Sequence, residues 1–169
     1  LVLRKGKKVY DKNFGYHTFK KKRPVLKNDI YDLASLTKIL GTLPLVINSV
    51  SKGEINFETT ISDLLPEWKN SNKSEITLKK MLSHQAYLFP WIPFYKKTLN
   101  SRGYPKKNIY QSKSSKKFSL PVISNLFLKS DFEKEIYKQI KESTLLKNEE
   151  SKYSDLPYYI LKIYFENKF

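Results

Sequence analysis

Apolar positions at the start of the chain follow the close spacing of β-strands. Residues 1–3 are Leu-Val-Leu, residues 5–7 are Lys-Gly-Lys, and Val9 and Tyr10 follow. Gly6 supplies the positive φ that a tight hairpin turn requires. The pattern therefore predicts a β-hairpin at the beginning of the chain.

The next apolar pattern has the period of a helix. From about residue 35 to residue 51, apolar side chains fall three and four positions apart, at Leu36, Ile39, Leu40, Leu43, Val46, Ile47 and Val50. Lys52 and Gly53 are typical of a helix end. Gly41 and Pro44 predict a kink, because an interior proline removes a backbone hydrogen bond.

Shorter segments follow. Residues 55–68 predict a turn and a short helix that ends at Pro66, and residues 74–88 predict a helix capped by Ser74 or Thr77. Residues 86–121 contain four prolines and predict a long ordered loop. The last two predicted helices are an amphipathic one at 131–143, capped by Asp131, and one within 153–169.

Composition limits the possible chemistry. An apolar content of 40% supports a packed core, and a length of 169 residues fits one domain or part of a larger one. The chain has no cysteine and two histidines, His17 and His84, so we expect no metal site and no cofactor. We expect structural roles for both histidines, with His17 at the end of a strand or hairpin. No apolar run approaches the ~20 residues of a membrane span.

The net charge of +16 is compatible with an anionic partner. However, 29 lysines outnumber 3 arginines, and base recognition favours the arginine fork. The cations are also spread along the chain. We therefore favour a solvated lysine surface and no specific nucleic acid, with a polyanion site as the alternative.

One candidate for catalysis is the S-x-x-K pair of Ser35 and Lys38. Chance alone would give about three such matches in so lysine-rich a chain, and the others are Ser49–Lys52 and Ser114–Lys117. Only Ser35 begins a predicted apolar helix, where the helix dipole would favour an alkoxide and a buried lysine could accept its proton. From these residues alone, a capping serine with a surface lysine remains the simpler explanation.

Further stretches in the same order strengthen the catalytic hypothesis. Residues 31–38 (YDLASLTK), 53–69, 76–88 (ITLKKMLSHQAYL) and 153–161 (YSDLPYYIL) resemble the serine β-lactamase and penicillin-binding protein superfamily, on its class C and esterase-like side. Residues 90–99 (PWIPFYKKTL) resemble the β-lactamase-related domain fused behind family 3 glycoside hydrolases. The resemblance covers nearly the whole chain.

The resemblance implies an α/β (α+β) fold in which a helical subdomain packs on an antiparallel sheet. It implies that Ser35 is the acylated nucleophile, that Lys38 shares its proton, and that Tyr153 assists proton transfer. Asp155 occupies the second-motif position at which asparagine is usual, and an ionised Asp155 near Lys38 would favour the protonated lysine. From the residues alone, Tyr153 could also be an ordinary packed aromatic.

Two departures from the family pattern bear on activity and on strain. No K-T-G or H-T-G motif follows Tyr153, so we expect this chain to be the N-terminal part of the domain, with an incomplete sheet. Tyr87 and Pro157 occupy positions where relatives often have glycine, and a positive φ would strain either residue.

These inferences define one partial domain over residues 1–169. We expect it to comprise a hairpin and loop at 1–34, the nucleophile helix at 35–52, a helical subdomain with the long loop at 53–150, and the second-motif loop and helix at 151–169. The resemblance implies a periplasmic or extracytoplasmic hydrolase. Its substrate would be a β-lactam, a D-alanyl peptide or an ester. The alternative is a non-catalytic relative that binds peptidoglycan or an anionic polymer.

Overall fold

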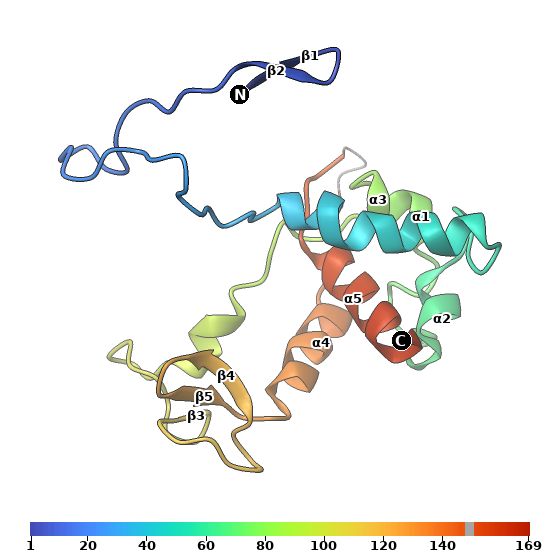
Figure 1. Cartoon of the computed structure of the whole chain (residues 1–169). Coiled ribbons are helices and arrows are strands. Elements are labelled where there is room, and N and C mark those ends of the chain that lie inside the picture. Colours follow the sequence, from blue (N-terminus) through green and yellow to red (C-terminus); the bar gives the residue numbers. More distant parts are fainter. Residues whose placement is uncertain (148–150) are drawn as a thin grey trace. The chain divides into compact units, whose positions relative to one another are not determined.

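The computed structural model describes residues 1–147 and 151–169 in two compact units, Leu1–Thr37 and Lys38–Phe169 (Figure 1). Residues 148–150, which end the predicted helical subdomain, lie outside the described residues.

The first unit contains the predicted hairpin. Strands β1 (Val2–Arg4) and β2 (Lys7–Tyr10) pair in antiparallel fashion. Lys5 and Gly6 both have positive φ, 49° and 72°, as a tight hairpin turn requires. The prediction of a hairpin with Gly6 in its turn is therefore confirmed.

The rest of the first unit has little regular structure and folds around the Asp29 carboxylate. This carboxylate accepts hydrogen bonds from the Leu26 N–H at 2.6 Å, His17 Nε2 at 2.7 Å and the Arg23 guanidinium at 2.6 Å. The Leu26 N–H and then His17 lower the pKa of Asp29 to about 2. His17 directly follows Tyr16, which forms an isolated antiparallel bridge with Pro24, so it lies at the end of a minimal strand pairing, and its side chain supports this loop.

The second unit begins with a helical segment that has an irregular first part. A π-helical turn, η1 (Lys38–Thr42), runs directly into α1 (Leu43–Ser51). Pro44 has no N–H to donate to the Leu40 carbonyl, and the widened turn lies at that place. The predicted helix is confirmed, and the irregularity expected from Gly41 and Pro44 takes the form of a π turn.

Two short helices follow with threonine caps. Helix α2 (Ile61–Leu64) begins with a capping box between Thr60 and Asp63 and leads into the 3₁₀ turn η2 (Pro66–Trp68). The Thr77 side chain, rather than Ser74, caps α3 (Leu78–Leu82).

The last two helices lie where the sequence predicts them. They are α4 (Phe132–Glu142) and α5 (Leu156–Lys168). Asp131 precedes α4, but its side chain forms no cap hydrogen bond and instead binds the Lys129 ammonium at 2.8 Å. The prediction that Asp131 caps α4 is therefore wrong.

The helices share one apolar core. Helix α5 contacts both η1 and α4 (Figure 1). The core side chains that are almost fully buried include Val46, Ile61, Leu65, Leu78, Met81, Leu88, Ile140, Leu156, Ile160 and Leu161. This packing fixes α5, and with it the loop that precedes α5, against the helix that begins at Lys38.

A small antiparallel sheet replaces part of the predicted long loop. After the 3₁₀ helix η3 (Phe94–Thr98), strands β3 (Tyr110–Gln111), β4 (Leu120–Ile123) and β5 (Leu126–Leu128) pair in the order β3-β5-β4. The prediction of a loop is wrong for these strands. Each strand is too short to show the alternation of apolar and polar residues by which strands are predicted. Helices and antiparallel sheet together confirm the predicted α+β class.

Lys73 lies in the core with no exposed surface. Its ammonium donates hydrogen bonds to Asn72 Oδ1 at 2.8 Å, to the Lys141 carbonyl at 3.1 Å and to the Ser143 carbonyl. Burial lowers the pKa of Lys73 to about 8. The side chain therefore satisfies carbonyl groups at the C-terminal end of α4, which otherwise have no helical donor.

Candidate active site

The candidate site is centred on Lys38, the first residue of the π turn. The Lys38 ammonium lies 2.5 Å from Asp155 Oδ1, although the two residues are 117 positions apart in the sequence. The Lys38 side chain is 13% exposed and that of Asp155 is 43% exposed. The two charges therefore form an ion pair at the edge of the core, with the carboxylate towards solvent.

Two tyrosine rings also face this ammonium. Lys38 Nζ lies 5.0 Å from the ring centre of Tyr153 and 5.3 Å from that of Tyr158, both within cation–π range. Lys38 also has a side-chain hydrogen bond with Tyr153. The cation is thus held by one carboxylate and two aromatic side chains.

This environment determines the charge state of Lys38. Burial acts to lower the pKa of Lys38, but the hydrogen bonds with Asp155 and Tyr153 outweigh it, so the pKa is raised above its ordinary value. Lys38 is therefore protonated at neutral pH. A protonated lysine cannot accept a proton, but it can stabilise a neighbouring anion.

Backbone hydrogen bonds fix the loop that carries Tyr153 and Asp155. The Lys152 N–H donates to the His84 carbonyl at 2.9 Å, and the Asp155 N–H donates to the Pro90 carbonyl at 2.8 Å. Ser154, which is 2% exposed, donates through its hydroxyl to the Phe89 carbonyl at 2.6 Å. The same hydroxyl accepts the Leu156 N–H, which begins α5. The second-motif loop is therefore joined to the loop that follows α3.

His84 supports the tyrosine of the site. Its ring lies 4.5 Å from the ring of Tyr153, and its Nδ1 accepts the Ser154 N–H at 3.3 Å. Burial and the charge of Lys38 lower the pKa of His84, while Asp155 opposes this shift. A neutral His84 therefore positions Tyr153 and the loop beside it.

Tyr87 and Pro157, the two positions at which relatives often have glycine, differ in backbone strain. Tyr87 has a φ of 56°, in the left-handed region that strains a bulky residue, and this agrees with the sequence-based expectation. Pro157, in contrast, lies in the first turn of α5, where a proline fits without strain. The strain expected at Pro157 is therefore wrong.

Ser35 belongs to the first unit and is exposed. It directly follows Ala34, whose φ of 43° is unusual for a residue with a Cβ, and the Ala34 N–H donates to Asp32 Oδ1 at 2.8 Å. Helical backbone begins at Leu36. Ser35 precedes Lys38 by three residues in the sequence.

The structure thus brings together Lys38, Tyr153 and Asp155 of the four predicted site residues. Sequence reasoning missed the contact of Tyr158 with Lys38. Tyr158 stands three residues after Asp155, and helical spacing places such residues on one face, which was the available signal.

Among residues 1–147 and 151–169, no three histidine or carboxylate side chains converge as metal ligands would. No helix in that part of the chain is long and apolar enough to cross a bilayer.

Replacing Asp155 with asparagine tests the ion pair. We expect Asp155→Asn to lower the pKa of Lys38, because the variant removes the neighbouring negative charge. The measurement is an NMR titration of the Lys38 side chain, assigned with Lys38→Arg. Asp131→Asn is the matched control, since Asp131 pairs with a different lysine, Lys129. An unchanged Lys38 titration in Asp155→Asn would contradict the ion pair.

Comparisons with known proteins give one family match and one similar curated protein. The family model described as Beta-lactamase matches residues 1–166. Penicillin-binding protein 4* of Bacillus subtilis (strain 168) is 28% identical over 88 residues, which are 52% of this chain and 19% of that protein. The chain thus matches about a fifth of the length of this curated relative. No solved structure matches the chain.

Proposed function

Because this chain belongs to the beta-lactamase family, we propose that it is a serine hydrolase that forms an acyl-enzyme at Ser35. The observation that carries the proposal is the cluster around Lys38. The lysine three residues after the candidate nucleophile is held by Tyr153 and Asp155 from the far end of the chain. A solvated surface lysine would need no such partners.

The charge state of Lys38 bears on which residue accepts the proton of Ser35. Because the cation favours an ionised neighbour, we assign the proton acceptor to the Tyr153 phenolate and electrostatic support to Lys38. Ser35 gives its hydroxyl proton to Tyr153 while its oxygen bonds to the substrate carbonyl carbon. The amide or ester bond then breaks, and the leaving group takes the proton from Tyr153. Water finally hydrolyses the acyl-serine and releases the acid.

The proposed substrates are amides or esters of the cell wall. We propose a D-alanyl peptide, a β-lactam or a small ester as the acyl donor, at a periplasmic or extracytoplasmic location. The name of the similar Bacillus protein, a penicillin-binding protein, supports the β-lactam as a probe.

A second candidate function is binding without catalysis. The observation that favours it is the carboxylate of Asp155, which holds Lys38 in its protonated form. If Tyr153 does not serve as the base, the site lacks a proton acceptor, and the protein would bind peptidoglycan or an anionic polymer.

Covalent labelling tests the proposal. The protein, expressed as it is encoded in full, is treated separately with a fluorescent penicillin and a fluorophosphonate, digested, and analysed by mass spectrometry. We expect one label, on Ser35. A label on Ser114, the serine of another S-x-x-K match, would contradict the assignment. Absence of label with both probes would favour the non-catalytic alternative.

A further inference from the structure

The cations of this chain are less evenly distributed than its total charge indicates. Residues 76–130 contain 11 lysines and arginines and no aspartate or glutamate. This stretch contains η3 and the sheet β3-β5-β4. Lys97 and Lys129 pair with the carboxylates of Glu135 and Asp131, and within the described residues the other cations of this stretch have no ion pair, so the segment attracts anions.

Where the sheet meets α4, the surface of the second unit is concave and several lysines line it. Two adjoining cavities of about 390 and 420 Å³ share Lys129, Asp131 and Lys134 in their walls. Lys138 lines the first cavity and Lys117 the second. We call this surface the lysine groove, after Lys117, Lys129, Lys134 and Lys138.

The backbone holds the two sides of the groove together. The Ser130 N–H donates to the Lys117 carbonyl at 2.9 Å, and the Lys129 N–H donates to the Ile109 carbonyl at 2.9 Å. These bonds place the loop that carries Lys117 beside the first turn of α4. The groove is therefore built from fixed elements.

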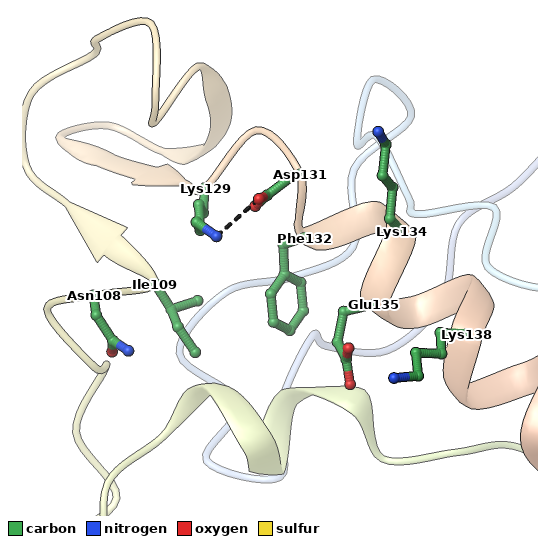
Figure 2. Close-up of a pocket in the computed structure, with 8 residues that line it drawn as sticks. All are labelled: Asn108, Ile109, Lys129, Asp131, Phe132, Lys134, Glu135 and Lys138. Carbon is green, nitrogen blue, oxygen red and sulfur yellow. Dashed lines mark hydrogen bonds and ion pairs between the residues drawn. The ribbon is translucent and has the colours of Figure 1, made fainter.

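The acidic residues of the groove are already paired. Asp131 binds Lys129 at 2.8 Å (Figure 2). Glu135 lies 3.5 Å from Lys97. Lys138 lies 4.0 Å from Glu142, at the limit of an ion pair. Within the described part of the chain, no ion pair neutralises Lys117 or Lys134. In Figure 2, the Lys134 side chain extends away from Phe132.

The shape and composition of the groove restrict the partner. It offers ammonium groups and no arginine fork, and its one aromatic side chain, Phe132, is buried. Nucleic-acid bases need exposed aromatic platforms or planar donors, and a membrane needs a flat surface with apolar side chains that insert. A narrow, flexible polyanion fits a concave surface that several lysines line, because its charges can follow the surface.

We propose that the lysine groove binds a linear polymer of phosphodiester-linked polyols. The polymer would lie along the groove with its phosphates next to Lys117, Lys134 and Lys138. This function is separate from acylation, because it uses residues outside the Lys38 cluster and needs no chemical step.

Binding of a fluorescently end-labelled poly(glycerol phosphate), measured by anisotropy over a range of salt concentrations, tests the proposal. We expect Lys117, Lys134 and Lys138 changed together to glutamine to weaken binding by roughly tenfold or more and to flatten the salt dependence. The matched control changes Lys7, Lys20 and Lys22 of the first unit to glutamine. It removes the same charge and is expected to bind within about twofold of the wild type. If the triple variant is unstable, Lys134→Glu replaces it.

Three outcomes would overturn the proposal. The first is no binding of the polymer at low salt. The second is equal weakening in the groove variant and the control variant, which would indicate unspecific charge attraction. The third is binding of a single-stranded oligonucleotide with the same number of phosphates, or of phosphatidylglycerol vesicles, at least as tightly as the polymer.

Discussion

Lys38→Met is expected to slow the acylation of Ser35 by about 10²–10⁴-fold, the usual contribution of a positioned proton-transfer group. Methionine keeps an unbranched apolar stem next to Tyr153 and Tyr158 but removes the cation. The Tyr153 phenolate would then lose the charge that stabilises it. Asp155 is partly exposed and remains solvated, so the free energy of unfolding should change little.

The measurement is the second-order rate constant for covalent labelling, with thermal unfolding as the check on folding. Lys52→Met is the matched control, because Lys52 completes another S-x-x-K match at the far end of the same helix. We expect the control to label at the wild-type rate. Wild-type labelling by a folded Lys38→Met protein would remove Lys38 from the mechanism.

Lys73→Met is expected to lower the free energy of unfolding by about 2 kcal/mol at neutral pH. The variant removes the side-chain donor of the Lys141 carbonyl and leaves the Ser143 carbonyl with the Asn72 side-chain amide as its donor, and an unsatisfied buried group costs about 1–3 kcal/mol. The loss is reduced because the wild type must desolvate an ammonium group and the variant does not.

The pH dependence of stability distinguishes this explanation from simple loss of packing. The pKa of Lys73 is about 8 in the folded state and near the ordinary lysine value of 10.5 in the unfolded state. Between these values the unfolded state binds more protons, so wild-type stability rises with pH. The difference between wild type and Lys73→Met should therefore widen by up to about 3 kcal/mol from pH 8 to pH 10.5.

Urea unfolding at several pH values provides the measurement. Lys69→Met is the control, since Lys69 is exposed and close to Lys73 in sequence. Subtracting the control removes the contribution of groups that titrate in all the proteins. A difference that stays constant over this pH range would show that the Lys73 ammonium is not desolvated as the structure indicates.

The local elements of this fold can be predicted from the sequence because short-range rules determine them. The hairpin follows from Gly6, and the helix that ends at Ser51 follows from apolar spacing. The sheet β3-β5-β4 cannot be predicted this way. Its strands have two to four residues, and Pro121 is tolerated because β4 is an edge strand. Strands β4 and β5 form a short local hairpin, but β3 joins it only through pairing between distant residues, such as Tyr110 with Leu128.

The same limit applies to the candidate site. The motif around Ser35 and the stretch that contains Tyr153 are visible in the sequence as separate pieces. The ion pair between Asp155 and Lys38 depends on the packing of α5 against η1. No local sequence pattern predicts this packing. The spacing of Tyr158 after Asp155 is a local signal, but the contacts of Tyr158 with Lys38 and of His84 with Tyr153 also depend on this packing. Likewise, the Asp131 cap failed because Lys129 competes for its carboxylate.

Because of the π turn at Lys38–Thr42, the direction in which the Lys38 side chain points depends on the number of residues in this turn as well as on the side chains around it. Each residue of a helix advances the backbone by about 100° around the axis. A one-residue deletion at Gly41 would close the wide turn and rotate Lys38 by that angle relative to the buried face of α1. Every side chain would remain present, yet the ammonium would point away from Asp155. In this protein, the count of residues between Lys38 and Pro44 is itself part of the site.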